Sequence, residues 1–292
     1  LEQIEIADQL ASTYYEMGNI KDANRENRFT FRVNVNEFGN DSAELVPAIN
    51  KLAGWYEKIG EFTLARDYYK KSIELIENEY GEDDLRLVSQ LQKVAGTYRG
   101  QHQLRGEGRD ALVRAVDIFE SHPEADVVAR ALTLTDLGDW LMVTSRRNDA
   151  IGIYKQAWNM LTGDGASPDK GKTVFGRPKR LRFIPPIPTA QELTGANEVY
   201  VDVAFAVTPE GGVTDLEVQD ATAHWRLQND VRMAMRGARY RPKFSNGEPV
   251  PAKMNFRWTY RVPNHLRRPQ AAAPETAEPT QSDGSATKNS RN

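Results

Sequence analysis

Hydrophobic positions follow a helical period in the first 161 residues and a strand period after residue 198. In the first part, an apolar residue, a small residue and then another apolar or aromatic residue recur, with starts 42, 42 and 43 residues apart. The four occurrences are Leu10-Ala11 with Tyr14, Leu52-Ala53 with Tyr56, Val94-Ala95 with Tyr98, and Leu137-Gly138 with Leu141. Such a period predicts one supersecondary unit that is stacked several times.

A second set of small residues keeps the same spacing. Its members are Ala23, Ala65, Gly108 and Ala150, and in two repeats an aromatic residue follows four positions later, at Tyr69 and Tyr154. Small residues at these offsets let two antiparallel helices approach closely, and the aromatic ring fills the groove between neighbours. The predicted unit is a helical hairpin, with Gly18 and Gly60 ending the first helix of their pairs and Tyr14, Tyr56, Tyr69 and Tyr154 in the core.

These markers resemble the tetratricopeptide repeats of about 42 residues found in kinesin light chains. The resemblance covers residues 1–161 and implies a right-handed superhelix of about four helix pairs. Asn27 stands where the second-helix aromatic residue of the first repeat is expected, so we interpret that repeat as a cap or a poorly packed end.

The resemblance also implies a peptide-binding groove along the first helices of the pairs. Asn50 and Lys51 occupy the matching positions in one repeat, and Gln92 and Lys93 occupy them 42 residues later. Stacked amides could hold a peptide main chain, and stacked ammonium groups could meet its carboxylates. A solvated polar face explains the same residues equally well.

Glycine and proline interrupt the periodicity between residues 162 and 188, which predicts a linker. Its central part, from Gly171 to Phe183, has no acidic residue and five basic ones: Lys172, Arg177, Lys179, Arg180 and Arg182. We expect a solvated, flexible strap, with the acidic helices, anionic lipid or glycan as the alternatives for its contacts.

The C-terminal part has the pattern of a small sheet with one packed helix, which gives an α+β domain. Alternation over residues 199–207 predicts a strand, residues 208–212 a turn, and residues 213–218 a second strand. Residues 223–236 form an amphipathic helix, with Leu227, Val231 and Met235 four positions apart, and residues 253–261 alternate again in a final strand.

At these positions the chain resembles the C-terminal domain of the TonB energy-transducer family of Gram-negative bacteria, over residues 189–262. The hairpin turn reads Val-Thr-Pro-Glu-Gly at residues 207–211, and the helix exit has the basic-x-x-basic-Tyr-x-Pro pattern at residues 236–242. Tyr240 is expected to pack under the sheet, while Pro242 restricts Arg241 to extended geometry. The chain departs from the family at Ala238, where a tryptophan is common, and in carrying helical repeats instead of a membrane helix and a long proline-rich spacer.

The family resemblance implies a role for the final strand. In the family, its edge accepts an extended receptor segment, the TonB box, through main-chain hydrogen bonds. The matching residues are Lys253, Met254, Asn255, Phe256, Arg257, Trp258, Thr259, Tyr260 and Arg261. Alternatively, Lys253, Arg257 and Arg261 protect an exposed edge against aggregation.

Composition and charge exclude several other classes of protein. The net charge of -3 divides into -8 over residues 1–161 (19 basic, 27 acidic) and +5 over residues 162–292 (19 basic, 14 acidic), which is too weak to imply nucleic acid. Cysteine is absent, and the four histidines show no metal-ligand spacing, so we expect no catalytic residues, no metal and no cofactor. Residues 263–292 are poor in large apolar side chains and are predicted to be disordered.

Taken together, these features predict a non-enzymatic adapter in the periplasm of a Gram-negative bacterium. Its C-terminal sheet would bind an outer-membrane transporter or another envelope protein by strand addition, while the repeats bind a second protein. The alternative is an envelope scaffold or oligomerisation protein without energy transduction. No segment is apolar enough to cross a bilayer, so membrane association is expected only through a partner or an N-terminal anchor outside this chain.

Overall fold

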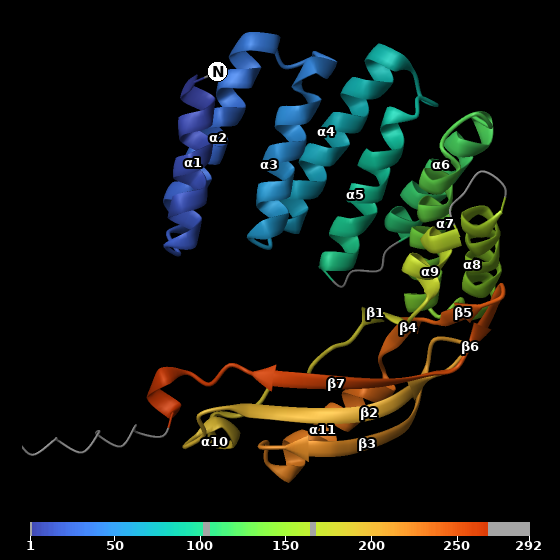
Figure 1. Ribbon diagram of the computed structural model, residues 1–292. Coiled ribbons are helices and arrows are strands. Elements are labelled where there is room, and N and C mark those ends of the chain that lie inside the picture. Colours follow the sequence, from blue (N-terminus) through green and yellow to red (C-terminus); the bar gives the residue numbers. More distant parts are fainter. Residues whose placement is uncertain (1, 102–105, 164–167, 268–292) are drawn as a thin grey trace, which may run out of the picture.

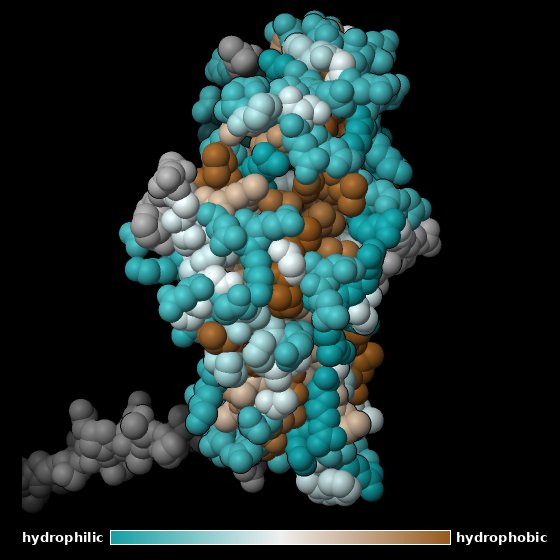
Figure 2. All heavy atoms as spheres, turned by 90° about the vertical axis from the view of Figure 1, so that its right-hand side faces the viewer, coloured by the Kyte–Doolittle hydropathy of each residue, from teal (hydrophilic) through white to brown (hydrophobic). Residues whose placement is uncertain are grey.

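The computed structural model describes residues 2–101, 106–163 and 168–267. An array of helices is followed by a small antiparallel sheet with a helix, as the two periods predict. In Figure 1 the helices stand in a row above the sheet, and the chain passes from one part to the other near α8 (Arg147–Thr162) and α9 (Pro168–Phe175). The side on which α8 and the β5–β6 hairpin lie is mostly hydrophilic, with hydrophobic side chains gathered about its middle (Figure 2).

In the described part of residues 1–163, four antiparallel helix pairs make up the array. Their bounds are α1 (Glu2–Glu16) and α2 (Ile20–Phe38), α3 (Val46–Lys58) and α4 (Phe62–Tyr80), α5 (Arg86–Gly100) and α6 (Gly106–Ser121), and α7 (Val127–Val143) and α8 (Arg147–Thr162). Gly18 and Gly60 have φ values of 76° and 83° between the helices of their pairs. That left-handed conformation is the one predicted for them, because glycine adopts it without strain.

Small residues allow the close helix packing that the repeat markers predicted. Ala23, Ala65 and Ala150 are completely buried. At Gly138, a Cβ atom would lie 2.4 Å from the ring of Tyr154, and at Gly108 one would lie 2.2 Å from the ring of Trp140. The aromatic rings therefore occupy the space that a larger residue at either glycine would need.

The first repeat is packed more loosely than the last. Helix α1 buries only Ala7 and Ala11, whereas Leu10 is 41% exposed. Tyr56, Tyr69 and Tyr154 are buried as predicted, but Tyr14 is only partly buried. Within the described residues, α1 contacts chiefly α2, whereas α7 contacts both α6 and α8, which explains the difference in burial.

The predicted flexible linker instead contains two ordered elements, α9 (Pro168–Phe175) and β1 (Lys179–Arg182). Phe175 is completely buried and meets the ring of Tyr154 edge to face at 5.8 Å. A single buried aromatic residue among glycines and prolines leaves no periodic signal, which explains why the sequence pattern pointed to a strap. The basic side chains of Arg177, Lys179 and Arg180 are exposed, in agreement with the prediction of a solvated segment.

The sheet has the predicted strands and a helix across one face. Strands β2 (Val199–Val207), β3 (Val213–Ala221) and β7 (Ala252–Tyr260) lie in the order β3-β2-β7, and all neighbours are antiparallel. Alternate residues of β2 are buried from Val199 to Val207. Helix α11 (Trp225–Arg236) covers this face with Leu227, Val231 and Met235.

Short elements connect the sheet to the repeats. Strand β4 (Arg239–Arg241) pairs with β1, and β5 (Lys243–Ser245) pairs with β6 (Glu248–Val250). Asn246 and Gly247 form the two-residue turn of that hairpin, with φ values of 52° and 82°. The remaining short elements are α10 (Ala190–Leu193) and the 3-10 helices η1 (Ala43–Leu45) and η2 (Asn264–Leu266).

The predicted disorder of residues 263–292 falls largely on residues 268–292, which lie outside the described part of the chain. The described residues at its start form hydrogen bonds with one another and with Gly195. Leu266 donates its backbone N–H to Pro263 and accepts one from Gly195, and Arg267 donates to the carbonyl of Val262.

Candidate functional site

Strand β7 forms one edge of the sheet. Each of its residues from Ala252 to Tyr260 pairs with β2 in an uninterrupted register, and no described residue pairs with its other side. Alternate backbone N–H and C=O groups along that side are therefore without a strand partner. Eight of the nine residues predicted to bind a partner, Lys253 to Tyr260, lie in β7, and Arg261 follows directly.

Strand β3 forms the other edge, and it is irregular. Its register with β2 shifts twice, between Asp202 and Val203 and between Ala204 and Ala206. Asp215 has a φ of 51°, which is rare for a residue with a side chain. Bulges twist an edge strand away from regular pairing, so β3 is blunted in a way that β7 is not.

The two faces of β7 have different surroundings. On the buried face, Phe256 and Trp258 pack against Phe183, with ring centroids 5.5 and 5.2 Å apart. The guanidinium of Arg180 lies 4.6 Å above the ring of Phe256. The segment after β1 thus covers the part of the sheet face that α11 does not reach, without forming a ladder with β7.

On the exposed face, Arg257 donates two hydrogen bonds to the carboxylate of Asp202 on β2, at 2.7 and 2.6 Å. These hydrogen bonds to Arg257 lower the pKa of Asp202. The guanidinium also lies 4.1 Å from the centre of the Tyr200 ring, and Tyr200 donates to Asp220 on β3 at 2.7 Å. Arg257 is therefore held flat on the sheet surface rather than over its open edge.

A buried ion pair joins the sheet domain to the last repeat. Arg241 of β4 donates two hydrogen bonds to Asp139 of α7, at 2.8 and 2.7 Å, and a third to the carbonyl of Val174 at 3.1 Å. Asp139 also accepts a hydrogen bond of 2.8 Å from the hydroxyl of Tyr154. Asp139 and Arg241 are 1% and 4% exposed. A buried charge pair with this many hydrogen bonds fixes the orientation of the elements that carry it.

The pKa values of Arg241 and Tyr154 depend on the charge of Asp139, with which both form hydrogen bonds. Burial alone would lower the pKa of Arg241, but its hydrogen bonds to Asp139 and the charge of that carboxylate raise it. Burial raises the pKa of Tyr154 well above its ordinary value, and the charge of Asp139 raises it further. Tyr154 therefore remains a neutral hydrogen-bond donor, and Arg241 remains charged.

An aromatic cluster seals the same junction. Phe244 of β5 is 2% exposed and stacks on Trp158 of α8, with centroids 5.9 Å apart. It also lies 5.0 Å from the ring of Phe175 and belongs to the hydrophobic core of the repeats. The β5–β6 hairpin thus caps the helical array and contributes Phe244 to its core, while the sheet keeps a core of its own.

The pair Arg241 and Asp139 was not predicted from the sequence, although signals for both were present. Tyr240 is 1% exposed within the sheet core, as predicted, and Pro242 keeps the chain extended. Because side chains of an extended chain alternate, Arg241 must point to the opposite side, where the repeats lie. Between Ala131 and Val143, the apolar residues of helix α7 are not confined to one face, which indicates that the helix is packed on more than one side, and Asp139 lies among them.

Three of the four predicted groove residues, Lys51, Gln92 and Lys93, contact a neighbouring repeat, and Asn50 contacts the second helix of its own repeat. Lys51 pairs with Asp8 of the first repeat, and Asn50 accepts a hydrogen bond from Ser72 at 3.4 Å. Gln92 donates to Thr133 at 3.0 Å and to Asp136 at 3.4 Å in the last repeat.

Lys93 lies 5.4 Å from the centre of the Tyr69 ring, and burial lowers its pKa. Lys51 is exposed, and the other three are half-buried. The polar groups of Lys51, Gln92 and Lys93 are therefore partly used in joining one repeat to the next.

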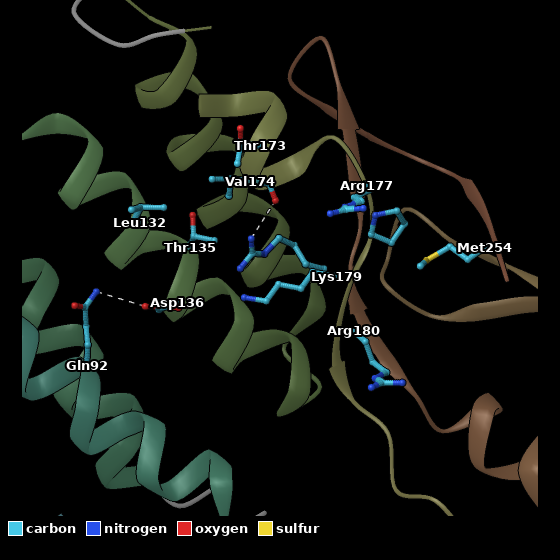
Figure 3. Close-up of a pocket in the computed structure, with 12 residues that line it drawn as sticks. Gln92, Leu132, Thr135, Asp136, Thr173, Val174, Arg177, Lys179, Arg180 and Met254 are labelled. Carbon is cyan, nitrogen blue, oxygen red and sulfur yellow. Dashed lines mark hydrogen bonds between the residues drawn. The ribbon is translucent and has the colours of Figure 1, made fainter. Parts of the chain in front are cut away.

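A cavity of about 770 Å³ lies where the repeats meet the sheet domain. Figure 3 shows Gln92 pointing toward Asp136, Lys179 reaching from β1 toward α7, and Met254 on the opposite wall. Burial raises the pKa of Asp136, while the charges of Arg99, Arg241 and Lys179 act against it. The cavity thus connects groove residue Gln92 to the beginning of β7.

Within the described ranges, no group of three or more His, Asp or Glu residues is arranged to hold a metal ion. In the same ranges, no helix has both the length and the apolar character needed to cross a membrane.

The fold, the open edge of β7 and the groove residues of the repeats define a class of protein. In this class, helical repeats are fused to a small α+β domain with an open edge strand. Residues 192–262 match the family model of the Gram-negative bacterial TonB protein C-terminal, and residues 48–85 match that of a tetratricopeptide repeat. Both resemblances noted in the sequence are therefore confirmed. Modules of these two kinds mediate interactions between proteins and are not catalytic.

The chain is also similar to solved structures. BtubC (BKLC) from P. vanneervenii is 18% identical, with a TM-score of 0.41, and the match covers 59% of this chain and 62% of that one. A protein of Podosopora anserina described as a kinesin light chain with nearly identical TPR-like repeats is 14% identical, with a TM-score of 0.47 and coverage of 56% and 77%. The match thus spans less than two thirds of BtubC. No curated protein matches the chain.

Proposed function

We propose that this chain is a non-enzymatic adapter that captures an extended segment of a partner protein on strand β7. The observation that carries the proposal is the regular, unpaired edge of β7 between Ala252 and Tyr260. An extended peptide added there would satisfy the outward N–H and C=O groups, and its alternate side chains would meet the two faces of the sheet.

The family match of residues 192–262 supports a particular kind of partner. That family acts in the periplasm of Gram-negative bacteria, so the partner is an outer-membrane transporter or a related envelope protein, and the adapter works in the periplasm. Binding through the main chain requires only that the partner segment be extended and free of proline at the paired positions.

The repeats would bind a second protein along their inner helices, at Asn50, Lys51, Gln92 and Lys93. Lys51, Gln92 and Lys93 already join neighbouring repeats, so a peptide there would exchange existing contacts for new ones. The buried pair of Arg241 and Asp139 would hold both partners in a fixed relation to each other.

Proline substitution tests strand addition. Amides of alternate β7 residues point away from β2, so Asn255→Pro and Phe256→Pro together include one outward donor. The other substitution removes a hydrogen bond between β7 and β2 and should disturb the fold. The variant that keeps its circular dichroism spectrum is therefore the one that lacks the outward donor. We expect its affinity for peptides from the periplasmic segments of outer-membrane transporters to fall more than about tenfold, measured by fluorescence anisotropy.

The matched control is the same pair of substitutions on the opposite edge, Glu217→Pro and Val218→Pro in β3. The folded control should bind as the unaltered chain does. Equal affinity of the folded β7 variant would exclude strand addition at this edge. If the unaltered chain instead forms dimers that the β7 proline abolishes, the edge serves self-association, and the protein is a scaffold.

A further inference from the structure

A group of unpaired cations lies between the repeat groove and the start of β7. Arg177, Lys179 and Arg180 line the junction cavity, all three are exposed, and none forms an ion pair with a described residue. In contrast, the nearby Arg241 is buried and paired with Asp139. Three neighbouring cations repel one another, so a negatively charged group placed among them would be stabilised.

These cations lie beside the edge strand β7. Met254, the third residue of β7, lies on the wall of the same cavity, and Arg180 stacks on Phe256 two residues further along. Figure 3 shows Arg177 and Lys179 between the α7 helix and the strand that carries Met254. A peptide paired with β7 that continues past Met254 would therefore enter the cavity at its cationic side.

We propose that the junction cavity receives an acidic flank of the same extended segment that adds to β7. Two or more carboxylates next to the paired residues would lie among Arg177, Lys179 and Arg180. This inference rests on the proposed strand addition and adds a charge preference to it. Because the cavity lies at the beginning of β7, the acidic residues follow the paired ones in an antiparallel partner and precede them in a parallel partner.

Three designed peptides test the charge preference on the full chain. Each has the same core of alternating Val and Thr residues, with four Glu residues before the core, four Glu residues after it, or four Gln residues at both ends. We expect one acidic peptide to bind about tenfold more tightly than the Gln peptide, with an advantage that shrinks at high salt. The position of its Glu residues gives the direction of the added strand.

Neutral substitutions identify the cations responsible. The double variant Arg177→Gln/Lys179→Gln should lose most of the acidic advantage and bind the Gln peptide unchanged. Its matched control is Arg226→Gln/Arg236→Gln, which removes two exposed charges from α11 and should keep the advantage. An advantage that survives Arg177→Gln/Lys179→Gln, or that both double variants lose equally, would overturn the inference.

The outcomes separate this inference from strand addition itself. If the Gln peptide binds, the β7 proline abolishes that binding and the Glu residues add nothing, then only the cavity proposal fails. If none of the three peptides binds, both fail. Phosphatidylglycerol vesicles provide a further arm: binding to them that depends on Arg177 and Lys179, without discrimination among peptides, assigns the cations to lipid and overturns the inference.

Discussion

The two edges of the sheet differ in regularity and in surroundings, although both belong to one hairpin-based sheet. β7 keeps its register over nine pairs and begins at the junction cavity, whereas β3 contains two register shifts and carries Asp215, Glu217 and Asp220. Binding competence at an edge depends on backbone regularity, which composition does not reveal. Both edges carry charged residues, so only the structure shows which is blunted.

The orientation of the two edges depends on the junction with the repeats, and its ion pair should give the largest effect. Arg241→Ala leaves the buried carboxylate of Asp139 without its cation, so we expect a loss of about 3–5 kcal/mol in the free energy of unfolding. Urea denaturation followed by circular dichroism measures it. The peptide affinity of β7 should fall as well, because its edge is no longer held beside the cavity.

The matched control is a second ion pair across the same junction. Lys155 of α8 lies 2.7 Å from Glu248 of β6, but their side chains are 41% and 65% exposed. Lys155→Met should cost less than about 1 kcal/mol, because exposed ion pairs contribute little. Similar losses for Arg241→Ala and Lys155→Met would mean that the buried pair does not fix the two parts of the chain.

A close approach of the β2–β3 turn to the repeats should give the next largest effect. Gly211 has a φ of 74°, and a Cβ atom there would lie 2.2 Å from the carbonyl oxygen of Tyr240 and 2.8 Å from the sulfur of Met142. Gly211→Ala should therefore cost about 2–3 kcal/mol, from backbone strain and from this clash together. Denaturation with urea gives the value.

Gly195→Ala separates strain from the clash. Gly195 has a similar φ of 77°, but nothing lies within 4 Å of its Cβ position. The expected cost is about 1 kcal/mol, because only the left-handed conformation is disfavoured. If both alanine variants lose the same stability, the turn is free to move away from α7, and the orientation of the sheet edges has another cause.

The sequence predicted the elements that carry a regular period. Alternation located β2 and β7 to within a residue, and the repeat markers at Ala23, Ala65 and Ala150 proved to be buried helix contacts. These features follow from local patterns of burial, which a sequence records directly.

Contacts between the two parts of the chain were not predicted. Arg241 and Asp139 are 102 positions apart, and each appears in the sequence as an ordinary charged residue. Phe175 and Phe244 are single aromatic residues in segments without periodicity. The junction cavity was equally unforeseen, because it exists only where six separate elements meet. Pairings of this kind depend on tertiary geometry, for which one sequence has no local signal.

A smaller effect is expected from removing the charges of each edge strand. This change tests whether backbone irregularity or charged side chains keep the sheet from self-association. Lys253→Val/Arg257→Val makes β7 an apolar, regular edge, so we expect dimers at roughly 100 µM in sedimentation velocity. Glu217→Val/Asp220→Val makes the same change in β3, whose bulges should keep it monomeric. Self-association of the β3 variant alone would reverse the assignment of the open edge.

Alkaline titration should give the smallest effect, and it concerns β7 rather than β3. Burial, with the charges of Asp230 and Glu192, raises the pKa of Tyr260 to about 12. The folded chain therefore holds this proton more tightly than the unfolded chain, whose pKa is near 10. The stabilisation is fully present below pH 10 and is lost as the pH rises from 10 to 12. In Tyr260→Phe, urea midpoints should fall less steeply over that range, and identical slopes would show that the phenol ionises freely in the folded sheet.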